Sequence, residues 1–333
     1  MTLQDEIKAI EDEIRTTKYN KATQQHVGRL KAKLARLKEE LIKRRTGGAG
    51  GANTGYSIRK AGDATVALVG FPSVGKSTLL NKLTNAESEV GAYDFTTLKV
   101  VPGIMDYEGA RTQILDLPGM VYGASSGRGK GREIISVLRA SDLILFLIDV
   151  FNIKQLETLK KELYDSGIRL DERPPEIKIK RKKTGGISVN STLKLTKVNE
   201  EEVKAVLSEY KMHNTEVVFR EDTTIDRFID VLTKNRVYLP SIVALNKVDL
   251  VKEEYIKEAT KHLKGRDYIP ISADKDTNLE KLREAIYKKL KFIKIFMKPQ
   301  GKKADFDEPM IVVVGATVGD VCDRMHREKK KSF

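Results

Sequence analysis

The sequence is poor in the residues that build disulfides and metal clusters. It holds one cysteine, Cys322, and four scattered histidines in 333 residues. A single cysteine cannot close a disulfide within the chain, and this inventory argues against a cysteine-rich or histidine-based metal site. The fold must therefore form without a disulfide or a cysteine-rich zinc site.

Long apolar runs are also absent. The longest, Leu143–Ile148, has the length of a strand, well short of the roughly 18 apolar residues of a membrane-spanning helix. The N-terminal residues are charged and lack the apolar segment of a secretory signal. We therefore expect a soluble, cytoplasmic protein with no membrane partner.

Positive charge is what the chain has in excess. It carries 61 Lys and Arg against 47 Asp and Glu, a formal net charge of +14. Such a balance favours anionic partners, including RNA and the ribosome, although charge alone is a weak indication. A hydrophobic content of 40% suffices for a core, and the length predicts two or three domains.

The N-terminal 46 residues predict two helices that pair as a hairpin. Their apolar stripes consist of Leu3, Ile7, Ile10 and Ile14, and of Leu30, Leu34, Leu37 and Leu41. The polar segment Thr16–Thr23 predicts the turn. The basic residues away from the stripes are Lys31, Lys33, Arg36, Lys38, Lys43, Arg44 and Arg45. A solvated face is their ordinary interpretation, and RNA contact is the alternative.

After a glycine-rich linker, Gly47–Gly55, strands alternate with helices. The expected strands are Ala64–Val69, Val100–Met105, Thr112–Leu115, Leu143–Ile148, Ile242–Leu245 and Tyr268–Ile271, and the expected helices are Lys76–Asn85 and Asn278–Ile293. This order predicts an α/β fold with a doubly wound, mostly parallel sheet.

Residues 165–236 interrupt that pattern and predict a small α+β insert. Its expected elements are strands at Ile177–Lys180, Ile187–Val189 and Glu216–Phe219, a helix capped by Asn199 and Glu202, and a helix striped by Ile225, Phe228, Ile229 and Leu232. The basic run Lys178–Lys183 is either a solvated strand or loop, or a nucleic-acid contact.

The segment Gly70–Ser77, GFPSVGKS, matches G-x-x-x-x-G-K-[ST] between a predicted strand and a predicted helix. The glycines let consecutive N–H groups face phosphate oxygens, Lys76 reaches the β- and γ-phosphates, and Ser77 offers its hydroxyl to Mg²⁺. The nucleotide-binding residues expected here are Gly70, Pro72, Ser73, Val74, Gly75, Lys76, Ser77 and Thr78. A chance glycine-rich turn is the weaker interpretation.

Two further segments follow the P-loop, one just after the predicted strand that ends at Leu115 and one in the loop before the predicted strand that begins at Val100. Asp116 and Gly119 belong to a DxxG segment, in which the Asp holds Mg²⁺ through water and the Gly119 N–H contacts the γ-phosphate. In the polar loop before Val100, Thr97 is expected to bind Mg²⁺ when the γ-phosphate is present, in preference to Thr96. We therefore expect Lys76, Thr97 and Gly119 to be catalytic, and Ser77, Thr97 and Asp116 to be metal ligands.

A base-recognition segment follows the strand Ile242–Leu245. The NKxD residues are Asn246, Lys247 and Asp249. A carboxylate at Asp249 pairs with guanine N1–H and the exocyclic amine, which adenine does not match. Ser272 and Ala273 follow the last strand, where a backbone N–H can reach guanine O6. The sequence thus predicts a site for GTP and GDP rather than for ATP.

These motifs resemble the translation-factor-class GTPases, and the segments Tyr93–Thr97 and Asp116–Glu133 resemble the Obg branch. The similarity is to the developmentally regulated GTP-binding protein family, in an archaeal-looking version, and spans nearly the whole chain. The resemblance implies six segments: a helical domain at 1–46, a linker at 47–60, a GTPase domain at 61–164 and 237–294, the insert at 165–236, and a truncated TGS domain of β-grasp type at 295–333.

The resemblance also implies Mg²⁺-dependent GTP hydrolysis, association with the ribosome or RNA, and a regulatory protein partner of that family. Many relatives that use potassium carry Asn three residues before the P-loop lysine, where this chain has Ser73. Potassium use therefore stays open, since the Ser hydroxyl is still an available ligand. The TGS-like segment, with a strand at Met310–Val314 and a helix from Thr317, is expected to be incomplete.

Met120 stands where Ras-like enzymes place a water-orienting Gln. A thioether cannot orient water, so we predict slow intrinsic hydrolysis unless a partner, an ion or another residue assists. Arg128 or Arg132 is a weaker candidate for a phosphate contact. Two competing functions remain: a constitutive RNA-binding scaffold in which nucleotide is structural, and an ATPase, against which Asp249 argues.

Overall fold

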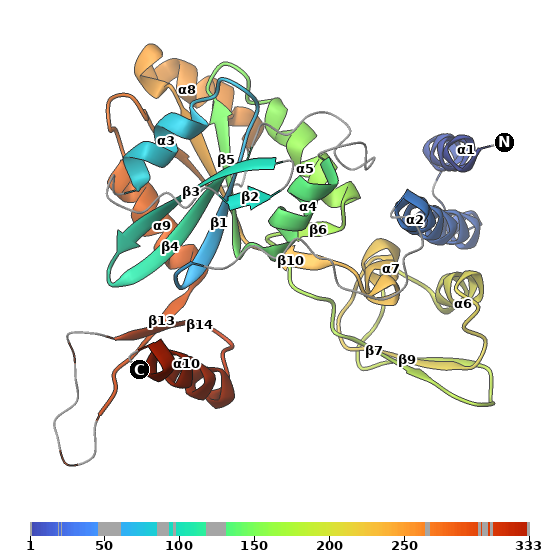
Figure 1. Ribbon diagram of the computed structural model, residues 1–333. Helices are drawn as coiled ribbons and strands as arrows, with labels where there is room; N and C mark the ends of the chain where they lie inside the picture. The colour runs from blue at the N-terminus through green and yellow to red at the C-terminus, as the bar shows by residue number, and fades with distance from the viewer. Residues whose placement is uncertain are drawn as a thin grey trace. The chain divides into compact units, whose positions relative to one another are not determined.

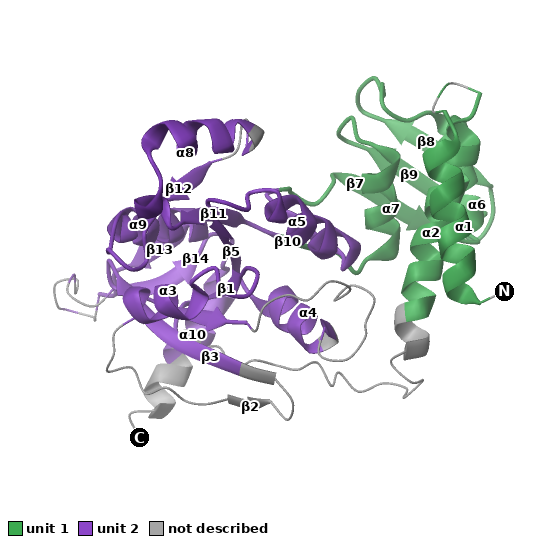
Figure 2. Ribbon diagram, turned by 90° about the horizontal axis from the view of Figure 1, so that it is seen from above, with its two compact units in different colours: residues 1–53, 172–238 green, residues 54–171, 239–333 purple. Residues whose placement is uncertain are grey.

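The chain forms two compact units, as the computed structural model shows (Figures 1 and 2). One unit comprises residues 1–53 and 172–238, and the other comprises residues 54–171 and 239–333. The structure describes residues 2–18, 20, 22–45, 61–84, 93–95, 98–117, 131–263, 267–298, 301, 306 and 309–331.

The larger unit is built on a seven-stranded sheet with the strand order β12-β11-β5-β1-β4-β3-β2. The strands are β1 (Ala64–Val69), β2 (Tyr93–Phe95), β3 (Leu98–Tyr107), β4 (Ala110–Asp116), β5 (Leu143–Asp149), β11 (Ser241–Asn246) and β12 (Tyr268–Pro270). The pairs from β12 to β4 are parallel, whereas β3 and β2 each run antiparallel to their preceding neighbour in this order. The predicted α/β fold with a mostly parallel sheet is confirmed.

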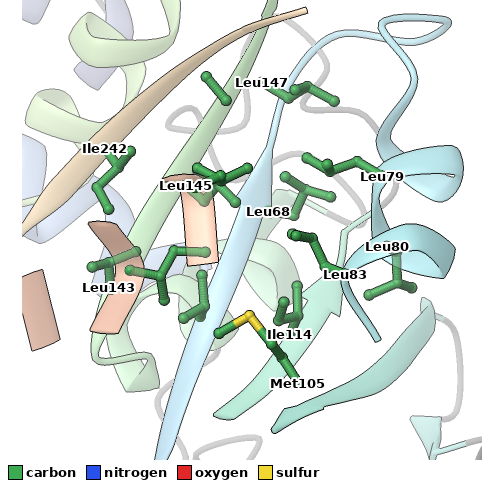
Figure 3. Close-up of a cluster of buried hydrophobic side chains, with 14 of the residues drawn as sticks. Leu68, Leu79, Leu80, Leu83, Met105, Ile114, Leu143, Leu145, Leu147 and Ile242 are labelled. Carbon is green, nitrogen blue, oxygen red and sulfur yellow. The ribbon is translucent and has the colours of Figure 1, made fainter. Parts of the chain in front are cut away.

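The helices of this unit are α3 (Lys76–Leu83), α4 (Gly131–Ala140), α5 (Gln155–Asp165), α8 (Glu253–Ala259) and α9 (Leu279–Leu290). Every residue of β1 and β5 is buried, which explains why their sequences are apolar apart from Thr65 and Asp149. Leu68 and Leu145 of these strands pack with Leu79 and Leu83 of α3 in the core drawn in Figure 3. β6 (Ile168–Leu170) and β10 (Val237–Leu239) form a separate two-stranded sheet.

The smaller unit joins two segments that are distant in sequence. The helices α1 (Leu3–Thr16) and α2 (Gln24–Arg45) confirm the expected hairpin. The remaining elements are α6 (Glu200–Glu209), α7 (Ile225–Thr233) and a sheet ordered β7-β9-β8, with bounds Ile177–Arg181, Thr215–Phe219 and Ile187–Ser191. Ala32 of α2 is fully buried in one core with Val203 and Phe228. The second N-terminal helix and the insert, separate in the sequence pattern, therefore share a hydrophobic core.

Close approach of α2 to α6 depends on Gly28. A Cβ atom at this position would lie 2.9 Å from the Cγ atom of Glu202, a fully buried residue of α6. In the sheet, β9 lies between β7 and β8, so the strands on either side of Gly185–Gly186 do not pair with each other.

The helix expected over Asn278–Ile293 was too long at its C-terminal end. Lys291 adopts a left-handed conformation at φ 51°, which terminates α9 after Leu290. Phe292–Ile295 then forms β13, antiparallel to β14 (Met310–Val313), and α10 (Val318–Lys331) follows. The assignment of this C-terminal part to a TGS domain stays a prediction. None of the described helices is long and apolar enough to cross a membrane.

Candidate functional site

The P-loop connects β1 to α3, the context that the motif requires. Gly75 has φ +95°, and a Cβ atom there would lie 2.6 Å from the Asn246 Nδ2 atom. A Cβ atom at Gly70 would lie 2.5 Å from the Leu147 carbonyl oxygen. Only glycine fits at either position without a shift of the loop. Ser73 also has a left-handed backbone, at φ 62°, and Pro72, Val74 and Thr78 complete the expected loop residues.

Lys76 is the buried cation of this loop. Its ammonium donates to the Gly70 and Phe71 carbonyl oxygens at 3.2 and 3.1 Å, and the residue is 9% exposed. Burial lowers the pKa of Lys76, and the nearby Asp116 carboxylate opposes that shift. A cation held inside a loop of backbone amides is suited to bind phosphate oxygens.

Ser77 and Asp116 form an oxygen-rich pair beside the lysine. The Ser77 hydroxyl donates to the Asp116 Oδ2 atom at 2.7 Å. The Oδ1 atom of Asp116 is buried and has no hydrogen-bond partner among the described residues. Mg²⁺ prefers such hard oxygen ligands. This pair therefore fits the metal site predicted from the sequence.

Asn246 connects the P-loop to the loop after β12. Its Nδ2 atom donates to the Val74 carbonyl oxygen at 2.8 Å, and its Oδ1 atom accepts from the Ala273 N–H at 3.0 Å. The bracing role expected of Asn246 thus has a geometric basis. The Ala273 N–H, expected to contact guanine O6, is engaged by Asn246 in this structure, and its contact with guanine stays a prediction.

Asp249 lies beside the same loop with its carboxylate ionised more readily than usual. A hydrogen bond with the Ser272 side chain lowers the pKa of Asp249, and the Lys275 ammonium, 3.8 Å from its Oδ2 atom, adds to that effect. An ionised carboxylate only accepts hydrogen bonds. Asp249 therefore has the charge state needed to accept two guanine N–H groups.

Asp149, at the end of β5, was missed in the sequence. Its Oδ2 atom accepts from the Lys247 ammonium at 2.8 Å, and its Oδ1 atom accepts from the Phe151 N–H at 2.9 Å. Lys247 also donates to the Ser73 carbonyl oxygen at 3.1 Å. The sequence signal that could have revealed Asp149 is its place as the acidic residue that ends an otherwise apolar strand.

These residues meet at one edge of the sheet. The site loops follow β1, β4, β5, β11 and β12, which run in parallel, so their carboxyl ends share an edge. Four expected residues, Thr96, Thr97, Gly119 and Met120, lie outside the described residues. So does Arg128, and the side chain of Arg132 is not described either. Their roles stay predictions.

Comparison with known proteins extends over the whole chain. The family described as "50S ribosome-binding GTPase" matches residues 65–181, and the "C-terminal region of MMR_HSR1 domain" matches residues 184–292. An uncharacterized GTP-binding protein of Methanocaldococcus jannaschii is 56% identical over all of this chain and 85% of its own length.

Two eukaryotic relatives also match the complete chain. The developmentally-regulated GTP-binding protein 1 homolog of Dictyostelium discoideum is 44% identical, with 91% of its own length covered. The ribosome-interacting GTPase 1 of Saccharomyces cerevisiae is 43% identical, with 90% of its length covered.

Proposed function

Because the chain belongs to the developmentally regulated GTP-binding protein family, we propose that it hydrolyses GTP to GDP and phosphate with Mg²⁺. We further propose that the bound nucleotide controls its binding to the ribosome or RNA. The observation that carries the proposal is the gathering of Lys76, the Ser77–Asp116 pair and Asp249 on loops at one edge of the sheet.

Guanine selection rests on Asp249 in this proposal. Its carboxylate would accept from guanine N1–H and the exocyclic amine, while Asn246 and Lys247 hold the loop in place. Adenine has no exocyclic amine at that position and its N1 is unprotonated, so the carboxylate acceptor would be left unsatisfied. Sites of this kind reject the mismatched ligand by a factor on the order of 10⁴.

Phosphate binding and hydrolysis rest on the P-loop. The Lys76 ammonium and the loop amides would bind the phosphate oxygens and stabilise the charge that develops during attack by water. Mg²⁺, held by Ser77 and Asp116, would neutralise charge between the β- and γ-phosphates. Thr97 and Gly119 are proposed to complete this site when GTP is bound, and Met120 supports a slow intrinsic rate.

Nucleotide specificity is tested by competition against labelled GDP. We expect GTP to displace the label and ATP to fail at concentrations on the order of 10⁴-fold higher. Asp249→Ala should abolish this preference, whereas Asp323→Ala, an exposed acid of α10, should leave it intact. Equal displacement by ATP and GTP with the unaltered chain would favour the ATPase alternative.

The link to translation is supported by the +14 net charge and by a relative named for its interaction with the ribosome. Such a link would place the protein's action in the cytoplasm and would allow for a regulatory protein partner. Co-sedimentation with ribosomes in GDP and in a non-hydrolysable GTP analogue tests it. Stronger binding with the analogue supports the switch. Equal ribosome binding with the two nucleotides, at a level that Lys76→Ala does not change, supports a constitutive scaffold.

A further inference from the structure

The structure distinguishes two basic segments that look alike in the sequence, one in α2 and one in β7, by the ion pairs that their side chains make. Four basic residues of α2 are engaged by acids within the smaller unit, at 2.7 to 3.0 Å. These pairs are Lys31 with Asp226, Lys33 with Glu6, Arg36 with Glu209, and Lys38 with Glu11. Each contact neutralises a cation locally. This part of α2 therefore offers little free positive charge to an external anion.

The basic residues of β7 have no such partners. Lys178 and Lys180 are exposed, and neither makes an ion pair or a side-chain hydrogen bond with any described residue. Arg220, which follows β9, is also exposed, and its side chain is likewise unpaired within the described parts of the chain. Lys178, Lys180 and Arg220 thus differ from the four basic residues of α2 that are held in ion pairs.

Strand alternation puts these cations on one face. Ile177 and Ile179 of β7 and Val217 of β9 point into the core with α6 and α7, which lie on one side of the sheet (Figure 1). Lys178 and Lys180 therefore point to the other side, where they stand about 6.6 Å apart. We call this other side the open face. No described element of the smaller unit covers it.

The register identifies the other members of the open face. Lys178 aligns with Val218 and Asn190, and Lys180 aligns with Glu216 and Ser188. Lys182 belongs to the same face, since its ammonium lies 3.2 Å from the Ser188 hydroxyl and 3.6 Å from the Glu216 carboxylate. Arg220 follows the buried Phe219, so alternation puts it on the same face, where its backbone N–H donates to the Glu176 carbonyl oxygen. Three lysines and Arg220 against Glu216 and Glu176 leave the open face with a charge of about +2.

We propose that the open face of the β7-β9-β8 sheet binds the backbone of folded, double-stranded RNA. The proposal rests on the RNA-binding part of the proposed function and names the surface that performs it. Lys178, Lys180 and Arg220 contact phosphates, and Asn190 offers hydrogen bonds to phosphate or 2′-hydroxyl groups.

The composition of the open face selects this partner. It presents no aromatic side chain among the described residues, so it has no platform for stacking the bases of a single strand. Val218 is its one apolar member in the aligned register. An acidic protein partner would need the aromatic or aliphatic anchors that dominate protein interfaces. A duplex backbone needs only regularly spaced cations and polar groups.

The test is RNA binding by the full chain over a range of salt concentrations, with a mixed-sequence RNA duplex, the same RNA as a single strand, and polyglutamate as probes. We expect the duplex to bind best. Lys178→Ala/Lys180→Ala should weaken duplex binding and reduce the slope of log K against log salt by about two. Lys178→Arg/Lys180→Arg should retain both affinity and slope.

The matched control is Lys257→Ala/Lys261→Ala, which removes two exposed lysines from the α8 region of the larger unit. It should leave the slope within experimental error of the unaltered chain. Both β7 substitutions are at exposed positions, so we expect the sheet to remain intact. Thermal unfolding of each variant checks this.

Three results of the RNA-binding test would overturn the inference. They are no duplex binding by the unaltered chain, an unchanged slope in Lys178→Ala/Lys180→Ala, and polyglutamate binding as tight as duplex binding. Ribosome co-sedimentation of the same variants keeps the two proposals apart. If the double alanine variant binds ribosomes in the GTP-analogue state as the unaltered chain does, the open face is excluded while the proposed switch stands.

Discussion

Lys247 bridges Asp149 and the P-loop: its ammonium lies 2.8 Å from the Asp149 Oδ2 atom and donates to the Ser73 carbonyl oxygen at 3.1 Å. One side chain thereby connects the end of β5, the segment after β11 and the phosphate-binding loop. Asp149 is 8% exposed, so the acidic partner of the pair is largely shielded from solvent, whereas the Lys247 side chain is partly exposed. This relationship indicates that Asp149 positions Lys247.

The first prediction concerns this ion pair. Asp149→Asn should weaken GDP and GTP binding by about tenfold, because a hydrogen bond to a charged group contributes about 1.5–3 kcal/mol. Titration with a fluorescent GDP measures the effect. Asp323→Asn provides a control at an exposed acid of α10. Unaltered affinity in Asp149→Asn would show that Lys247 does not depend on this partner.

The second prediction concerns the metal site. Ser77→Ala removes the hydroxyl that lies 2.7 Å from Asp116. GTP affinity in the presence of Mg²⁺ should fall, and more Mg²⁺ should be needed for half-maximal hydrolysis, because one metal ligand is lost. GDP binding in EDTA should change little. An equal loss with and without Mg²⁺ would indicate that Ser77 has a structural role in the loop instead.

The third prediction concerns the pH dependence of stability without nucleotide. Burial lowers the pKa of Lys76 below its ordinary value of 10.5. Between the lowered and the ordinary pKa, the unfolded chain binds more protons at this residue, so its contribution to stability rises with pH. Below that window, the charged lysine is a net cost to the folded state.

Lys76→Met isolates this contribution. At neutral pH it should stabilise the nucleotide-free protein by about 0.5–2 kcal/mol while nucleotide binding is lost. The gain over the unaltered chain should shrink as pH rises toward 10.5. Urea unfolding at several pH values measures both. A difference in unfolding free energy between the two proteins that does not change with pH would contradict a destabilising buried charge at Lys76. So would a variant that is less stable than the unaltered chain at neutral pH.

The fourth prediction concerns the core shared by the N-terminal helices and the insert. Phe228 is fully buried in that core together with Ala32 of α2. Phe228→Ala should destabilise the smaller unit by about 3–5 kcal/mol. Hydrogen exchange should therefore accelerate in α2 as well as in β7, with Phe228→Leu as the milder control. Acceleration confined to residues 172–238 would show that the two segments fold independently.

The parts of the fold specified by local sequence could be predicted. The apolar strand at Ala64–Val69 and the helix at Lys76 are encoded by short patterns, because burial on both faces and the P-loop geometry leave few alternatives. The end of α9 could not be predicted in this way. Phe292 is in β13 because it pairs with Val313, about twenty residues away in the chain, and no local pattern shows that partner.

The same limit applies to the candidate site and to the basic segments. The motif residues identified the loops, but the contact of Lys247 with Asp149 joins residues at the ends of β11 and β5, which are neighbours only in the folded sheet. Likewise, Lys31 and Lys178 are equivalent as sequence letters. Only the structure pairs Lys31 with Asp226 and leaves Lys178 free among the described residues.

Phosphate release from GTP and ATP, by the unaltered chain and by Lys76→Ala, tests the central claim most directly. The account predicts Mg²⁺-dependent release from GTP alone, slower than the roughly one per second of a modest kinase, and its loss in Lys76→Ala. Equal release from ATP, or release that survives in Lys76→Ala, would contradict the assignment of this site to GTP hydrolysis.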